Sequence, residues 1–256
     1  MALLIRTLLA TLLALAAALA AAGDARFMAL SYHEVLADDE PLTPTAVRAS
    51  DLARQFAWLQ ANDFHPVSVD QILAARADGP PLPPNAILLT FDDGKKDVYT
   101  RAFPLLTLFG YPAVIALVGK WMDAPPGQMV DYDGEPLPRS DFVTWEQVRE
   151  MQASGLIEVA SHSYDLHHGI IANPQGNTQP AATTRLYANG RYEDDAAYLA
   201  RLRADLRDSI SQHTGRAPRI IVWPYGRSNL AAQEVAAQLG MPIGLTLVDG
   251  FNDAGT

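Results

Sequence analysis

Side chains that could bind a metal gather in one short segment, residues 157–170, which reads IEVASHSYDLHHGI. Its apolar start gives way to His162, His167 and His168, although the whole chain holds only 6 histidines. Imidazole nitrogens combined with a carboxylate oxygen form a common ligand set for a divalent ion such as zinc or iron. The segment therefore raises the hypothesis of metal chemistry just beyond the end of a strand.

Three other apolar runs also end in polar or turn-forming residues. Residues 32–34 (Tyr-His-Glu) follow FMALS, residues 92–94 (Asp-Asp-Gly) follow AILLTF, and residues 224–226 (Pro-Tyr-Gly) follow RIIVW. Each motif alone has a structural explanation, because Asp-Asp-Gly can be a turn with a helix N-cap and Pro-Tyr-Gly can be a turn. The four motifs can form one chemical site only if all four strand ends meet.

The surrounding sequence predicts strands that alternate with helices. The expected strands cover residues 27–33, 65–69, 85–91, 112–118, 156–160, 219–223 and 242–247. The expected helices cover residues 50–62 (with Ser50 as N-cap), 97–109, 144–155, 195–213 and 229–239. Two stretches rich in Pro, Gly and polar residues, 121–141 and 169–194, are expected to be loops.

Alternation of this kind is typical of an α/β fold in which helices cover a parallel sheet. The near-continuous apolar strands also fit a parallel sheet better than a sandwich. About seven βα units favour a barrel, intact or distorted, and in such barrels the chemistry lies at the carboxyl ends of the strands. The four polar motifs are therefore expected to share one mouth.

The paired aspartates Asp92 and Asp93 suggest a division of labour. Adjacent side chains at a strand end point in different directions, so one carboxylate could bind a metal while the other accepts a proton. Water held by a divalent ion beside such a base is a hydrolytic nucleophile. The residues alone thus favour metal-assisted hydrolysis and leave the substrate open.

Composition limits the class of protein. The 256 residues are 49% hydrophobic and 19% charged, enough for a domain with a sizeable core. The formal charge of −10 argues against nucleic acid or an anionic membrane surface as a partner. The chain has no cysteine, which excludes disulfides, thiolate metal ligands and a lipid-carrying cysteine within this sequence.

The first residues have the pattern of a secretory signal peptide. One arginine precedes a run of Leu and Ala, which ends in small residues before Gly23 and Asp24. We expect residues 1–22 to be the signal peptide, and the protein to be periplasmic or secreted without a stable membrane anchor. The alternative is an uncleaved anchor, because the run is nearly long enough to span a bilayer.

Three motifs, LLTFDDG, ASHSYDLHHG and VWPYG, resemble those of the polysaccharide deacetylases, carbohydrate esterase family four. The resemblance covers essentially the whole chain after residue 22. SYHEV, the five-residue step from His162 to His167, HHGIIANPQGN and TTRLY resemble one branch more closely. That branch is the exported poly-β-1,6-N-acetyl-D-glucosamine N-deacetylases of bacterial biofilm systems.

The resemblance implies a fold and a set of roles. The fold would be a distorted (β/α)7-type barrel of the NodB-homology kind, circularly permuted in this branch. Asp93, His162 and His167 would hold one divalent metal ion, whether zinc, cobalt, nickel or iron. Asp92 would be the general base, and His33 would protonate the leaving amine.

Further residues are implied for the pocket around the reacting carbonyl. A backbone N–H near Tyr225 would help to stabilise the oxyanion, and Trp223, Pro224 and His168 would belong to the substrate pocket. Val222 stands where the family usually has an arginine, so the residue that orients Asp92 is left open.

The implied activity is metal-dependent N-deacetylation of an exported poly-β-1,6-N-acetyl-D-glucosamine polymer. It would release acetate and expose amines for export of the polysaccharide, with an outer-membrane export apparatus as a further partner. Residues 24–256 would form the deacetylase domain, and the sequence has no room for the C-terminal glycoside-hydrolase domain common in relatives. The alternatives are a deacetylase of peptidoglycan, chitin or an O-acetylated glycan, a metal-free glycosidase, and a carbohydrate-binding module with a vestigial site.

Overall fold

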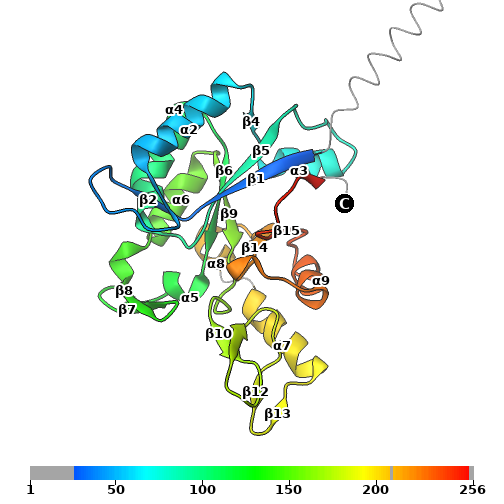
Figure 1. Cartoon of the computed structure of the whole chain (residues 1–256). Coiled ribbons are helices and arrows are strands. Elements are labelled where there is room, and N and C mark those ends of the chain that lie inside the picture. The colour runs from blue at the N-terminus through cyan, green and yellow to red at the C-terminus, as the bar shows by residue number, and fades with distance from the viewer. Residues whose placement is uncertain (1–25, 208–209, 254–256) are drawn as a thin grey trace, which may run out of the picture.

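The computed structural model describes residues 26–207 and 210–253 (Figure 1). The predicted signal peptide, residues 1–22, lies outside the described residues. Within the part that is described, no helix has the length and apolar character needed to cross a membrane.

The centre of the molecule is an eight-stranded sheet. Its strands are β1 (Arg26–Tyr32), β4 (His65–Pro66), β5 (Ala86–Phe91), β6 (Ala113–Leu117), β9 (Ile157–Ser161), β14 (Ile220–Val222), β15 (Ile243–Leu245) and β16 (Asn252–Asp253). The order across the sheet is β15-β14-β9-β6-β5-β1-β16, with β4 paired to the start of β5. All pairs are parallel except β1 with β16.

From β1 to β15, strands that are neighbours in the sheet follow one another along the chain, apart from the short β4, which lies off this order. This is the winding of a barrel, but no pairing joins β15 to β16 among the described residues, so the sheet stays open. The predicted distorted α/β barrel is therefore confirmed. Parallel strands wound in this way bring all their carboxyl ends to one edge.

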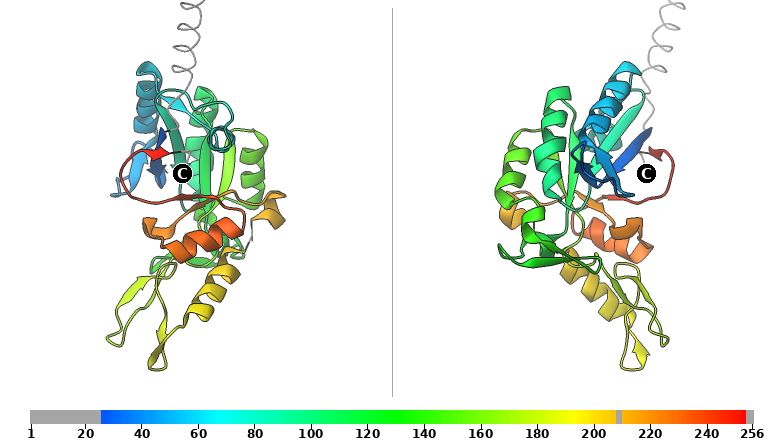
Figure 2. Two further views of the ribbon diagram at one scale, coloured as in Figure 1. Left: turned by 90° about the vertical axis from the view of Figure 1, so that its right-hand side faces the viewer. Right: turned by 60° about the vertical axis from the view of Figure 1, so that its left-hand side comes forward.

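Helices cover the sheet and connect its strands. They are α2 (Ala49–Ala61), α3 (Val69–Arg76), the π-helical turn η1 (Val98–Ala102), α4 (Phe103–Phe109), α5 (Gly119–Met122), η2 (Arg139–Asp141), α6 (Trp145–Ala153), α7 (Asp195–Leu206), α8 (Ser211–Thr214), η3 (Pro224–Gly226) and α9 (Leu230–Gln238). Helices α2, α4 and α6 lie side by side along one face of the sheet (Figure 2).

Strand β5 is buried along its whole length because both of its faces pack against apolar groups. Leu89 and Phe91 face the core formed with α2, α4 and α6, whereas Leu88 faces a second core that includes α3. A strand buried on both sides reads as a continuous apolar run, which is why its position was predictable from AILLTF. Its carboxyl end delivers the paired aspartates.

Two helices differ from their predicted bounds. Helix α2 begins at Ala49 with Arg48 as N-cap, so Ser50 lies inside the helix rather than capping it. The Ser50 N–H donates to Asp38 Oδ1 at 3.2 Å, so Asp38 satisfies an N–H of the first turn. The helix predicted over 195–213 ends at Leu206, where Arg207 takes an extended conformation, and α8 begins separately at Ser211.

Both predicted loops contain two-stranded ribbons. The first holds β7 (Met129–Tyr132) and β8 (Glu135–Pro138), and the second holds β10 (Gly169–Ile171), β11 (Thr178–Pro180), β12 (Tyr187–Ala188) and β13 (Arg191–Tyr192). Hairpins β7–β8 and β12–β13 turn at Asp133-Gly134 and Asn189-Gly190, all four residues having positive φ. Asp-Gly and Asn-Gly favour such turns, so the sequence carried this signal. A further short pair, β2 (Glu34–Leu36) with β3 (Ala46–Arg48), was not predicted.

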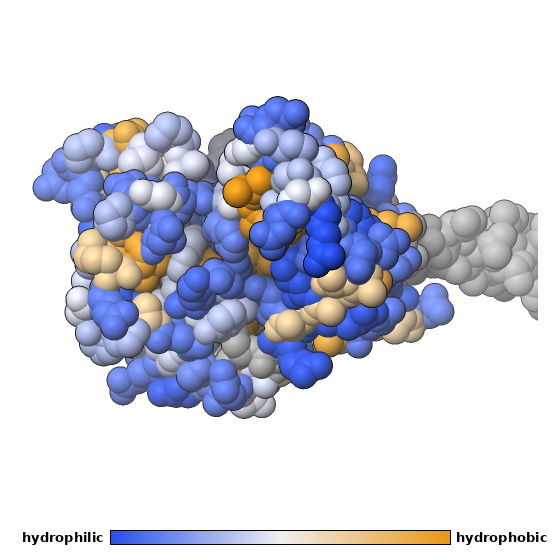
Figure 3. All heavy atoms as spheres, turned by 90° about the horizontal axis from the view of Figure 1, so that it is seen from below, coloured by the Kyte–Doolittle hydropathy of each residue, from blue (hydrophilic) through white to orange (hydrophobic). Residues whose placement is uncertain are grey.

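The ribbons β10–β13 and helix α7 project from the lower end of the molecule (Figures 1 and 2). Seen from below, the surface is largely hydrophilic, with small scattered apolar patches (Figure 3). The polar character that predicted a loop over residues 169–194 therefore reflects solvent exposure rather than a lack of secondary structure.

Candidate active site

The end of β5 separates its two aspartates. Asp92 continues the strand, with its N–H donating to the Tyr32 carbonyl at 2.9 Å. Asp93 (φ 72°) and Gly94 (φ 69°) then turn the chain in the left-handed region. A Cβ at position 94 would lie 2.7 Å from Leu117 Cδ2, so any other residue would displace that side chain and adopt a disfavoured φ. The two carboxylates consequently point to different neighbours.

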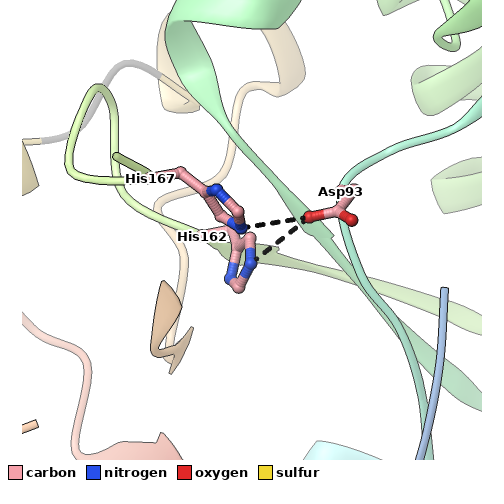
Figure 4. A group of neighbouring side chains, drawn as sticks. All are labelled: Asp93, His162 and His167. Carbon is pink, nitrogen blue, oxygen red and sulfur yellow. Dashed lines mark ion pairs between the residues drawn. The ribbon is translucent and has the colours of Figure 1, made fainter. Parts of the chain in front are cut away.

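The two histidines come from the segment that follows β9. His162 Nδ1 lies 2.6 Å from the Val222 carbonyl oxygen on the neighbouring strand β14, which leaves Nε2 free to face the site. Its Nε2 is 3.5 Å from Asp93 Oδ1, and His167 Nε2 is 3.6 Å from the same oxygen (Figure 4). Two segments distant in sequence, one after β5 and one after β9, thus converge on one point.

These three side chains fit a divalent metal ion. Their ligand atoms lie within 4.8 Å of one another, and they are the one such group found in the described part of the chain. Asp93 Oδ1 is buried and has no hydrogen-bond partner among the described residues, as expected for an oxygen that binds a cation. Ligands about 2 Å from a tetrahedral ion are themselves roughly 3.3 Å apart, close to the separations observed.

The surroundings also set the protonation of these groups. Burial lowers the pKa of His162, so the ring stays neutral and keeps a lone pair for a ligand bond. Burial raises the pKa of Asp92, which makes its carboxylate a stronger base than an exposed aspartate. A neutral imidazole for binding and a carboxylate with raised basicity are the properties that metal-assisted hydrolysis uses.

Strand β1 supplies the neighbours of Asp92. Ser31 Oγ donates to Asp92 Oδ2 at 3.0 Å, and His33 Nε2 lies 4.0 Å from the same oxygen. Ser31 is therefore a residue that orients Asp92, a position that the sequence left open. The signal was its place two residues before His33, because alternate residues of a strand face the same side.

Hairpin β7–β8 reaches the site from the other side. The Tyr132 hydroxyl donates to Asp93 Oδ2 at 2.5 Å. Asp133 accepts a hydrogen bond from the Tyr225 hydroxyl, and its Oδ1 lies 3.6 Å from His167 Nδ1. Sequence reasoning missed both residues because the segment was predicted as a loop, and the Asp133-Gly134 turn was the signal that could have found them.

The remaining predicted pocket residues differ in position. Tyr225 has a φ of 57°, and the centroid of its ring lies 4.6 Å from that of the His167 ring. It borders a cavity of about 750 Å³ that His33 and Asp92 also line. Trp223 borders the same cavity, but it is only 1% exposed and belongs to the core beneath α7 and α9. Pro224, between Trp223 and Tyr225 in the sequence, is buried in the turn η3.

His168 lies outside the group of three. Its side chain is 47% exposed, and its Nδ1 is 3.8 Å from Asp165 Oδ1. It borders an adjacent cleft of about 860 Å³, which shares His167 and Asp133 with the first cavity. The structure thus brings Asp92, Asp93, His162 and His167 together with His33, and leaves His168 at the periphery.

An open α/β barrel with an Asp-His-His group at its mouth defines a class of hydrolase, and comparison with known proteins identifies the family. Residues 79–244 match the family described as polysaccharide deacetylase, and the chain belongs to this family. The resemblance inferred from the motifs is therefore confirmed.

Individual members of the family show which deacetylases this chain is similar to. The chain is 41% identical over 233 residues to the poly-β-1,6-N-acetyl-D-glucosamine N-deacetylase of Escherichia coli K12, a match that covers 89% of this chain. The chain spans only 35% of that relative's length. Among solved structures, a de-N-acetylase from Aggregatibacter actinomycetemcomitans is 40% identical (TM-score 0.85; 90% of this chain, 92% of that one). The BpsB deacetylase domain of Bordetella bronchiseptica is 46% identical (TM-score 0.82; 91% and 93%).

Proposed function

We propose that this protein is a metal-dependent N-deacetylase of a poly-β-1,6-N-acetyl-D-glucosamine polymer. The observation that carries the proposal is the Asp93–His162–His167 group, with the base candidate Asp92 beside it in the same cavity. The identities of 41% and 46% to proteins named as deacetylases support the same reaction, and the name of the Escherichia coli relative supports this polymer.

Asp93, His162 and His167 would hold the metal ion, and this donor set suits zinc, cobalt, nickel or ferrous iron. When bound, a divalent ion at this point makes water more acidic and polarises a carbonyl oxygen. Tyr132 would fix Asp93, and the Val222 carbonyl would fix the ring of His162. Such outer contacts orient ligands and strengthen binding.

The other residues would move the protons. Asp92, oriented by Ser31, would accept a proton from the water that attacks the acetamide carbonyl. The carbon–nitrogen bond then breaks, and His33 would donate a proton to the leaving amine. The products are acetate and a glucosamine unit with a free amine. The backbone N–H of Tyr225 is the proposed donor to the developing oxyanion.

The biological setting follows from the same proposal. Residues 1–22 would direct export, residues 24–256 would form the deacetylase domain, and the protein would act in the periplasm or as a secreted enzyme. Exposing amines gives the polymer a partial positive charge, which would change how it is exported or retained. An outer-membrane export apparatus is the partner that this role implies.

A panel of acetylated substrates tests the choice of polymer. The purified protein is incubated with β-1,6-linked N-acetylglucosamine oligomers, chitin oligomers, peptidoglycan fragments and an O-acetylated glycan, and free amine and acetate are measured. The proposal expects equal amounts of amine and acetate from the β-1,6-linked oligomers and much slower release from the others. Release confined to another member of the panel would keep the reaction and reject the polymer.

A further inference from the structure

The position of His167 depends on the four residues that separate it from His162. Ser163 has a φ of 69°, in the left-handed region that residues other than glycine seldom adopt. Its Oγ accepts the Leu166 N–H at 3.0 Å, and its own N–H donates to Ser161 Oγ at 3.1 Å. We call residues 163–166 the ligand loop, because it links the two proposed histidine ligands.

The ligand loop is held on one side by helix α5. Gly119 N–H donates to the Ser163 carbonyl at 3.1 Å, and Lys120 N–H donates to the Tyr164 carbonyl at 2.9 Å. Both contacts use carbonyl oxygens of the loop. They leave the N–H groups of its two central residues to be satisfied from elsewhere.

Helix α7 supplies that contact through one carboxylate. Asp205 Oδ1 accepts the Tyr164 N–H at 2.9 Å, and Asp205 Oδ2 accepts the Asp165 N–H at 2.8 Å. A carboxylate is the side chain whose two oxygens can receive two consecutive N–H donors in this forked way. Leu166, only 3% exposed, packs into the core that contains Leu202 of the same helix.

We propose that Asp205 is a positioning residue that fixes the ligand loop and thereby holds His167 in place for the metal. The inference rests on the metal site of the proposed function. Burial raises the pKa of the Asp205 carboxyl to about 6, so the charged form is costly at this position. The two hydrogen bonds from the loop offset part of that cost.

The test compares the metal affinity of the purified full chain with that of two variants. Asp205→Asn keeps the shape of the side chain but turns one acceptor into an NH₂ group that faces an N–H donor. Asp195→Asn, at the exposed start of the same helix, is the matched control. Zn²⁺ affinity is measured by competition with a chromophoric chelator, and thermal unfolding is measured on the metal-free proteins.

The proposal expects Asp205→Asn to weaken Zn²⁺ binding about 10-fold or more, as is typical when a contact that orients a ligand is lost. Asp195→Asn should stay within about twofold of the parent. A merely structural role would lower the melting temperature of metal-free Asp205→Asn and leave its Zn²⁺ affinity unchanged, and that result would overturn the proposal.

Two further outcomes of this test also have a definite interpretation. If Asp205→Asn does not fold, Asp205→Glu replaces it, since it keeps the charge and both acceptors but displaces them by one methylene. Weakened Zn²⁺ binding in that variant supports the proposal and unchanged binding overturns it. If the parent chain binds no Zn²⁺, Co²⁺ or Ni²⁺, the proposed metal site and this inference both fail. Equal binding by parent and variant rejects only the role of Asp205.

Discussion

At the scale of single residues, Asp92 and Asp93 have the same chemistry and different surroundings. Asp93 receives a hydrogen bond from Tyr132 and faces two imidazoles, whereas Asp92 receives one from Ser31 and lies beside His33. Neighbours of this kind suit Asp93 to hold a metal and Asp92 to exchange a proton. Each role makes a separate prediction.

Replacing either carboxylate by an amide should separate the two roles. Asp92→Asn removes the proton acceptor but no metal ligand, so turnover should fall by about 10²–10⁴-fold with metal content unchanged. Asp93→Asn should lose metal. Metal analysis after desalting, together with amine release, measures both effects. Metal loss in Asp92→Asn with retention in Asp93→Asn would mean that the roles are reversed.

The adjacent histidines form a natural matched pair. His167→Ala removes a side chain that points at Asp93 Oδ1 from 3.6 Å, and it should abolish stable metal binding. His168→Ala removes a half-exposed ring outside the group and should retain metal. Equal metal loss in the two variants would show that the ligand had been assigned to the wrong position.

At the scale of elements, the sheet was predicted, whereas hairpin β7–β8, which completes the site, was not, although its Asp133-Gly134 turn is a hairpin signal. AILLTF and IEVA are largely apolar runs that form buried strands of the sheet. Their hydrophobicity alone therefore revealed the strand ends that carry Asp92 and His162. Hairpin β7–β8 is short and largely exposed. The ring of its Tyr132 packs against Trp121 and Phe142, which lie outside the hairpin. Such tertiary contacts leave no periodic pattern in the sequence.

Hairpin β7–β8 should contribute to metal binding through Tyr132. Burial raises the pKa of this hydroxyl, which therefore stays protonated and can donate to Asp93. Tyr132→Phe deletes the donor and keeps the ring, so metal affinity should fall by roughly 3- to 30-fold. Tyr187→Phe in ribbon β12–β13 is the control, and chelator competition is the measurement. Unchanged affinity in Tyr132→Phe would exclude this role.

At the scale of the whole molecule, the open barrel explains why four motifs spread over nearly 200 residues form one site. Strands β1, β5, β6, β9, β14 and β15 lie in the sheet in their order along the chain, so a parallel winding was sufficient to predict that their carboxyl ends meet. The sequence analysis did not identify what orients Asp92. Strand alternation places Ser31 on the same face as His33, but only the register of β1 with β5 brings that face to Asp92. The tertiary fold thus determines the side-chain partners of Asp92, which residue spacing in the sequence does not reveal.

One buried group away from the site should affect the stability of the whole fold. Asp97 follows the site turn, its Oδ1 is buried without a hydrogen-bond partner in the described part of the chain, and burial raises its pKa to about 7. The folded state therefore holds this proton more tightly than the unfolded chain does. Its contribution to stability is fully present below about pH 4 and is lost as the pH rises through about 7.

Asp97→Asn should accordingly stabilise the protein at high pH. Compared with the parent, the free energy of unfolding should rise by roughly 1–3 kcal/mol at pH 8 and change little at about pH 4. Urea unfolding of both proteins at the two pH values measures the difference, with Asp141→Asn as an exposed control. A difference that does not depend on pH would contradict the assignment.

Hydrolysis by this protein should depend on a metal held by Asp93, His162 and His167. The most direct test is amine release from β-1,6-linked N-acetylglucosamine oligomers by the full chain, first stripped with chelator and then titrated with Zn²⁺, Co²⁺ or Ni²⁺. We predict that activity disappears in chelator and returns as about one equivalent of ion per chain is bound. Full activity in the chelated, metal-free protein would contradict the account and favour a metal-free mechanism.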